Sequence, residues 1–248
     1  AALFLDPLSV NMTFASLTSD GSGDNGVWLD GVSGSFTVTG ATTVTNAGLN
    51  GILIENSSGT LNFGDVDIDT TGADGVHINS NTGTINFNGT TTIQNTTGDG
   101  IDEASAGGGV NFGVTSITSA GANGINLSSA TGSYTFGATT INGFGTNKIG
   151  VNFVGANAAA TFGVTDIQNG GSGTGIDLSS TTGNQVITFA TGSNISNVAL
   201  GVELSSSHTT ATTANANFTF GDGGLPTGST INATTTVNAI GLDAASGT

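Results

Sequence analysis

The sequence predicts an all-β protein: a parallel β-helix of about nine coils, with about 25 residues and three short strands in each coil. Three observations predict this fold. An internal repeat runs along the chain, apolar and polar residues alternate inside each repeat, and turn residues separate the alternating stretches. The coil length and the three unequal sides favour the right-handed form.

The repeat is marked by a glycine that precedes an apolar-x-apolar triplet, and this mark returns every 24 to 26 residues. A phenylalanine and an isoleucine recur in step with it. Gly241 follows the last regular mark by 40 residues, so the final interval carries an insertion. The glycine marks are Gly26, Gly51, Gly75, Gly100, Gly124, Gly150, Gly175 and Gly201; the aromatic marks are Phe63, Phe87, Phe112, Phe136, Phe162, Phe189 and Phe220; the isoleucine marks are Ile68, Ile93, Ile117, Ile141, Ile167 and Ile195.

Each mark lies in a stretch such as TLNF or GINL, in which every second residue is apolar. This period of two is typical of a strand with one buried face. Asn-Gly and Asp-Gly pairs lie between the strands and are expected to supply the positive φ of tight corners. Stacked coils bury the apolar face and place equivalent residues roughly 4.8 Å apart, so the phenylalanines are expected to form one inward stack of rings.

Residues 1–248 are expected to form a single β-solenoid that is open at both ends. Unpaired strands at an open end invite association. The chain is therefore expected either to belong to a longer protein with flanking repeats or to stack with copies of itself, end to end or laterally. Residues 205–230, which include His208, are predicted to be loop insertions in the last full coil.

Charge excludes one class of partner. One Lys+Arg stands against 17 Asp+Glu, for a net charge of −16. A nucleic acid needs basic residues to neutralise its phosphates, so no nucleic-acid partner is expected. No apolar run is long enough for a membrane-spanning helix, so no membrane insertion is expected. The absence of cysteine excludes disulfides and thiolate metal sites, and it fits an extracellular protein stabilised by its length.

Acidic residues gather around the stretch TTGDGIDEAS, which resembles pectin-lyase-like β-helices, a group that includes polysaccharide lyases and hydrolases. The resemblance implies Asp99, Asp102 and Glu103, with His77 one coil away, as candidate catalytic residues. Two observations oppose catalysis. First, uronate-cleaving members of the group bind the substrate carboxylate with Arg or Lys, and this chain has a single Lys or Arg. Second, TTGDG is part of the turn that the repeat itself requires, because TTGADG stands at the same position one repeat earlier. The expectation is that the protein is not an enzyme. Glu103 stands where Ile or Leu points inward in other coils, and a local bulge is expected to turn it outward.

Calcium is the one cofactor for which the sequence offers candidate ligands. Asp65, Asp67 and Asp69 alternate with apolar residues, so all three are expected to project from one strand into solvent. Asp20 and Asp24, in DGSGDNG, loosely resemble a calcium loop. The alternative is a solvated acidic face that binds no ion and resists aggregation.

A row of small polar residues is predicted on the outer face of the second strand of each coil. This row resembles the flat threonine-rich faces of ice-binding β-solenoids, which order water. The alternative is that Thr and Asn simply suit exposed strands and form ladders in any solenoid. The candidate binding residues are Thr13, Thr37, Asn62, Asn86, Asn111, Thr135, Thr161 and Thr188.

The elements Gly-apolar-x-apolar, T-x-N-F-G and T-T-I mark the repeat along the whole chain, which thereby resembles the β-strand-repeat passenger regions of large bacterial surface or secreted proteins of the adhesin type. The resemblance implies an extracellular or cell-surface location and a structural or adhesive stalk, with copies of itself or a cell-surface glycan as partners. Ice binding and the binding or cleavage of polysaccharide are the alternatives.

Overall fold

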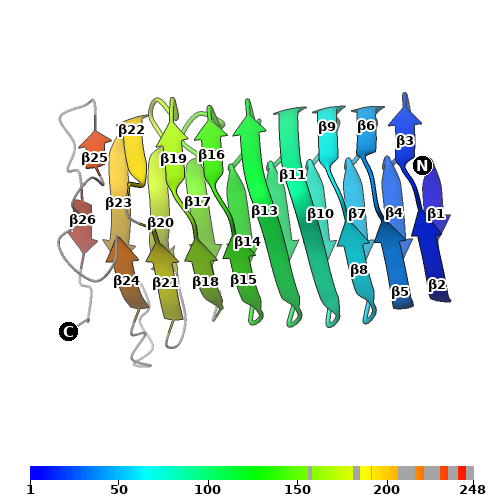
Figure 1. Ribbon diagram of the computed structural model, residues 1–248. Helices are drawn as coiled ribbons and strands as arrows, with labels where there is room; N and C mark the ends of the chain where they lie inside the picture. The colour runs from blue at the N-terminus through cyan, green and yellow to red at the C-terminus, as the bar shows by residue number, and fades with distance from the viewer. Residues whose placement is uncertain are drawn as a thin grey trace.

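The computed structural model describes residues 1–155, 158–180, 185–190, 192–205, 216–220, 230–233 and 240–243. All regular structure in these residues is β-strand, and every strand pair is parallel. The coils stack along one axis from β1 to β26, as Figure 1 shows. The predicted parallel β-solenoid is confirmed. The described part of the chain holds no helix with the length and hydropathy needed to cross a bilayer.

The first strand of each coil contributes to a ten-stranded sheet. Its members, in spatial order, are β1 (Leu3–Leu5), β4 (Val27–Asp30), β7 (Ile52–Glu55), β10 (Val76–Asn79), β12 (Ile101–Ala104), β14 (Ile125–Ser128), β17 (Ile149–Val154), β20 (Thr174–Ser180), β23 (Leu200–Ser205) and β26 (Ile240–Asp243).

The second and third strands of each coil belong to one 16-stranded sheet. The second series is β2 (Ser9–Phe14), β5 (Ser33–Val38), β8 (Thr60–Phe63), β11 (Thr84–Thr96), β13 (Gly109–Thr118), β15 (Ser133–Phe136), β18 (Ala159–Phe162), β21 (Gln185–Phe189) and β24 (Ala216–Phe220). The third series is β3 (Leu17–Asp20), β6 (Thr42–Ala47), β9 (Val66–Thr71), β16 (Thr139–Asn142), β19 (Thr165–Gln168), β22 (Asn194–Val198) and β25 (Thr230–Ala233).

Two coils depart from the expected three short strands, because β11 and β13 each continue through the second and third positions. In β11 the residues Asn88 and Gly89 stand where β13 has the single residue Gly113. The register between β11 and β13 shifts there, between Phe87 and Thr90. The extra residue forms a bulge, which lets one strand bend around the corner.

The core is a set of inward columns, as the repeat predicts. The phenylalanine rings from Phe63 to Phe189 stack with centroids 4.4–5.1 Å apart and interplanar angles of 3–11°. The isoleucines from Ile68 to Ile195 form a second column and are at most 1% exposed. Offset ring stacking adds to the apolar burial that holds neighbouring coils together.

The glycine of the Asn-Gly and Asp-Gly pairs has a different role from the one expected. These glycines do not have positive φ. A Cβ built on Gly75 would instead lie 2.4 Å from Cγ2 of Ile93 and 2.6 Å from the carbonyl oxygen of Gly100. Glycine is therefore required here because the isoleucine column and the next coil approach the backbone too closely for a side chain.

Most residues with positive φ form two other columns, one after the first strand and one after the third. Asn and Ser occupy most of these positions with φ of 50–60°. Asn tolerates this region better than most residues because its side chain bonds locally. The first column is Gly31, Asn56, Ser80, Ser105, Ser129 and Gly155; the second is Gly21, Asn46, Thr70, Asn95, Ser119, Gly143, Asn169 and Asn197.

The last interval of the repeat also differs from the sequence prediction. Val202 pairs with Ile240, so Gly241 lies opposite Glu203 and is not the equivalent of Gly201. Of the predicted insertion at 205–230, the structure describes Ser205, strand β24 and Thr230, while the rest, with His208, lies outside the described residues.

Replacing Gly75 with alanine tests the close approach between coils. Because the added Cβ meets side-chain and backbone atoms, Gly75→Ala should lower the free energy of unfolding by about 1–3 kcal/mol. The matched control is Gly23→Ala, since a Cβ at Gly23 has no atom within 4 Å. That control should change stability by less than about 0.5 kcal/mol. Urea unfolding followed by circular dichroism measures both, and equal effects would contradict this explanation.

Candidate functional site

The outer side chains of the first sheet form a single column. Its members lie directly opposite one another in the strand registers. Phe4 begins this column: its ring centroid lies 4.5 Å from that of Trp28, and it is 51% exposed. The column is Phe4, Trp28, Leu53, His77, Asp102, Asn126, Asn152, Asp177 and Glu203.

A cluster of Asp74, His77 and Asp102 lies in the middle of this column. His77 is on β10, Asp102 is its register partner on β12, and Asp74 is in the turn before β10. Nδ1 of His77 lies 2.9 Å from Oδ2 of Asp102 and 3.0 Å from Oδ2 of Asp74. Within the described part of the chain, this is the one group of three His, Cys, Asp or Glu side chains whose ligand atoms all lie within 4.8 Å of one another.

Asp74 is held by a ladder that repeats in each turn before a first strand. The side-chain Oδ1 of each Asn or Asp in this ladder accepts a hydrogen bond from a backbone N–H one coil further on. For Asp74 the donor is the N–H of Asp99, at 2.7 Å. The ladder consists of Asn25, Asn50, Asp74, Asp99 and Asn123, with distances of 2.6–3.1 Å. The ladder uses one oxygen of Asp74 and leaves Oδ2 facing His77.

Asp102 is oriented in a similar way by the outer column. Nδ2 of Asn126 donates to Oδ1 of Asp102 at 2.8 Å, and Nδ2 of Asn152 donates to Oδ1 of Asn126 at 2.8 Å. Each of the two carboxylates that contact His77 therefore has its other oxygen fixed by the next coil.

The protonation of the cluster follows from these contacts. The hydrogen bond to Asp102, and then the one to Asp74, raise the pKa of His77 to about 10, against the opposing effect of burial. Burial raises the pKa of Asp99 to about 6, and the charges of Asp74 and Asp102 add to this rise, while the hydrogen bond from the Asn123 N–H opposes it. At neutral pH the imidazole is therefore positively charged and lies between two carboxylates.

Glu103 does not belong to this outer cluster, so the expectation that a bulge turns it outward is wrong. It stands in register between Ile78 and Leu127, and it is 1% exposed. Strand β12 keeps its alternation, which directs this side chain into the core. Its Oε1 accepts a hydrogen bond from the N–H of Ala106 at 2.9 Å. Burial raises the pKa of Glu103 to about 8, so it is mainly uncharged at neutral pH.

Of the four residues that the resemblance implied as catalytic, the structure therefore brings two into contact, His77 and Asp102. Asp99 lies close enough for its pKa to respond to Asp102, but it is 9% exposed and its carboxylate belongs to the turn ladder. Glu103 points to the opposite side of the strand. Asp74 was missed, although its place in TTGADG, three residues before His77, was visible in the sequence.

The candidate calcium residues Asp65, Asp67 and Asp69 lie on or just before β9 and point outward, as predicted. Asp65 accepts a hydrogen bond from the N–H of Thr90 at 2.9 Å, and Asp69 accepts one from Nδ2 of Asn95 at 2.8 Å. These donors are on the next coil, so the carboxylates also contribute to stacking.

Asp20 and Asp24 are in the first coil. Asp20 accepts a hydrogen bond from the hydroxyl of Thr45 at 2.8 Å, and Asp24 accepts one from the N–H of Asn25 at 2.9 Å. Among the residues that the structure describes, none of the five calcium candidates joins a group of three ligand side chains. Calcium binding by these residues stays a prediction.

The predicted polar row on the second series is in register from Thr13 to Thr188. Part of the row is hydrogen-bonded along the axis. Nδ2 of Asn111 donates to Asn86 at 2.8 Å, Nδ2 of Asn86 donates to Asn62 at 2.9 Å, and Nδ2 of Asn62 donates to the Thr37 hydroxyl at 3.4 Å. The row is therefore an ordered surface, and ice binding by it stays a prediction.

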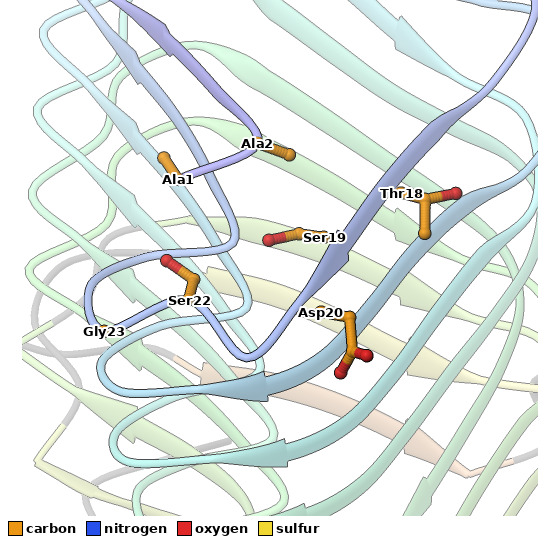
Figure 2. A pocket seen from close by; sticks show the side chains of 7 residues that line it. All are labelled: Ala1, Ala2, Thr18, Ser19, Asp20, Ser22 and Gly23. Atoms are coloured by element: carbon orange, nitrogen blue, oxygen red, sulfur yellow. The ribbon is translucent and has the colours of Figure 1, made fainter.

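An open hollow of about 320 Å³ lies at the first coil, where Figure 2 shows Asp20 and Ser22 among its lining residues. Ala1 and Ala2 complete one side of it. The hollow shares no residue with the His77 cluster.

No protein-family model matches the chain, and neither a curated protein nor a solved structure is found to be similar to it. The described part of the chain is a parallel β-solenoid with in-register polar rows and one histidine–carboxylate cluster.

Three raised pKa values predict how stability changes with pH. Asp99, Glu103 and His77 hold protons in the folded state that the unfolded chain releases, over windows of 3.8 to about 6, 4.5 to about 8 and 6.5 to about 10. Their stabilising contribution is complete below each unfolded value and is lost as the pH rises through the folded value. The free energy of unfolding should therefore be lower at pH 9 than at pH 5, as measured by urea unfolding.

The variant Glu103→Gln isolates the buried acid. It cannot ionise, so the decline between pH 4.5 and 8 should become shallower, by on the order of 1 kcal/mol per pH unit. Glu55→Gln, the same change on the outer side of β7, is the matched control. An unchanged slope in Glu103→Gln would show that Glu103 does not titrate in this window.

Proposed function

We propose that the chain is a structural or adhesive stalk of an extracellular or cell-surface protein, in which the solenoid acts as a stiff scaffold and its outer rows act as contact surfaces. The observation that carries this proposal is the polar row on the second series, which keeps its register from Thr13 to Thr188. Each coil contacts mainly its neighbours, so such a scaffold lengthens by adding coils and keeps the same surface chemistry throughout.

The row suits two kinds of partner. Hydroxyl and amide groups repeated roughly every 4.8 Å can donate and accept hydrogen bonds, either with the same row on a second copy or with the hydroxyls of a glycan. Charge sets a condition on self-association, because a chain of net charge −16 repels its copies. Salt screens that repulsion, and a divalent cation between acidic residues offsets it.

The contacts of Asp99 support a structural role for this candidate catalytic acid. Its Oδ1 accepts the N–H of Asn123 in the way that Asn25 accepts the N–H of Asn50 in another coil. Because Asp99 makes the same hydrogen bond as its equivalents in other coils, its contribution to stacking explains why an Asp or Asn stands at this position. This favours the stalk over polysaccharide cleavage as the function of this part of the chain.

Electron microscopy of the purified full chain, with calcium and with a chelator, tests the proposal. Ordered filaments or sheets are expected at raised ionic strength or with calcium, because both reduce the repulsion between acidic rods. Loss of these assemblies with chelator would identify bridging by calcium. Isolated short rods in every condition would overturn self-association.

A pair of double variants tests whether the polar row makes the contact. Thr135→Glu with Thr161→Glu adds two charges to the row on β15 and β18, and should abolish lateral assembly. Thr118→Glu with Thr140→Glu adds the same charge on the third series and should leave it intact. Equal behaviour of the two variants would mean that assembly does not use this row.

A further inference from the structure

We propose that Asp74, His77 and Asp102 form a binding site for a divalent transition-metal ion, for which Zn²⁺ is the best match. This proposal is independent of the stalk function. The site rests on the arrangement of the three side chains, of which His77 and Asp102 are also among the candidate catalytic residues that the resemblance implied.

Two carboxylate oxygens converge on the same ring nitrogen. Nδ1 of His77 lies 2.9 Å from Asp102 and 3.0 Å from Asp74. One imidazole nitrogen carries at most one hydrogen, and that hydrogen can point well at only one acceptor. A single ion placed among the three atoms would instead satisfy all of them at once. The three ligand atoms come from two coils and lie within 4.8 Å of one another.

The ligands are already oriented by outer contacts. The second oxygen of Asp74 accepts the N–H of Asp99, and the second oxygen of Asp102 accepts the amide of Asn126. Such outer hydrogen bonds fix ligand direction in metal sites and contribute to affinity. The rigid coil stack therefore prepares one oxygen of each carboxylate to bind an ion together with the imidazole.

The donor set selects the type of ion. One imidazole nitrogen and two carboxylate oxygens suit Zn²⁺ and related ions, whereas Ca²⁺ and Mg²⁺ prefer sites made of oxygen alone. The side chains of His77, Asp74 and Asp102 are 22%, 18% and 15% exposed, so water can reach a fourth position. Tetrahedral zinc bonds of about 2.1 Å place ligand atoms about 3.4 Å apart, so the two oxygens would move outward by roughly half an ångström.

Charge also favours a cation at this point. A third carboxyl group, that of Asp99, lies near Asp74 and Asp102. The whole chain contains a single Lys or Arg, Lys148, to balance such negative charge. The proton now held by His77 offsets part of this charge. Zinc would replace it: the metal–nitrogen bond forms at Nδ1 as one proton leaves to solvent.

Stacking alone does not require an Asp at positions 74 and 102, because Asn makes the equivalent hydrogen bonds in other coils. The turn ladder is completed by Asn50 and Asn123 in other coils, and the outer column by Asn126 and Asn152. Among the described residues, three such ligand side chains come together at this place only.

Isothermal titration of the full chain with Zn²⁺ at pH 8, in a buffer that does not chelate metals, tests the site. One ion per chain is expected, with release of a proton that appears as a dependence of the measured heat on the buffer. Excess Ca²⁺ should not compete. Absence of zinc binding up to pH 9, or equal binding of Ca²⁺, would overturn the proposal.

The variant Asp102→Asn removes one ligand and keeps a side chain that the next two coils use at the same position, so the fold should persist. It should bind zinc at least about 100-fold more weakly. Asp166→Asn is the matched control, because Asp166 also accepts an amide hydrogen bond from the next coil, from Asn194 at 3.0 Å. Unchanged zinc affinity in Asp102→Asn would overturn the site.

Histidine NMR provides a measurement that does not depend on a ligand variant. The chain has two histidines, His77 and His208, and His208→Gln assigns their signals. Zinc should shift Nδ1 of His77 and not the signals of His208. A shift of His208 alone would place the ion elsewhere and contradict the proposal.

Discussion

Parallel strands that stack in register place each residue against its equivalent one coil away, and the other features of this molecule depend on that constraint. A row can continue only if neighbouring side chains tolerate one another. Phenylalanine rings do so by stacking, as from Phe63 to Phe189, and amides do so because each can donate to the next and accept from the one before. Glycine is selected where a column approaches the backbone, as at Gly75.

Carboxylates cannot form such rows alone, because like charges repel. The structure commonly places an amide or a hydroxyl of the neighbouring coil against an acid. Asn56 donates to Asp30, Asn95 donates to Asp69 and Thr45 donates to Asp20. The exception is the place where Asp74, Asp99 and Asp102 meet across two coils. There the imidazole of His77 lies between two of the carboxylates, Asp74 and Asp102.

The positions of residues within the repeat predicted the columns correctly. Residues at equivalent positions of successive repeats are register partners in the stacked coils. Features that depend on the backbone conformation of one residue, or on the rotamer of one side chain, could not be predicted from the repeat. The left-handed corners at Asn46 and Asn56 leave no periodic apolar signal. Asp74 joins the site because its carboxylate spans two partners, which spacing alone does not reveal. Glu103 was misplaced because strand alternation outweighs the cost of burying an acid that remains protonated.

The direction of the coil-to-coil hydrogen bonds has a mechanical consequence. These bonds, such as that from the Val27 N–H to the Gly51 carbonyl, run along the stacking axis. Tension along the axis therefore loads the bonds between two coils at a time instead of shearing a whole sheet. Each coil that peels away frees about 25 residues, or about 80 Å of extended chain. The remaining coils keep their rows, so the rod would yield in equal steps and act as an extensible tether.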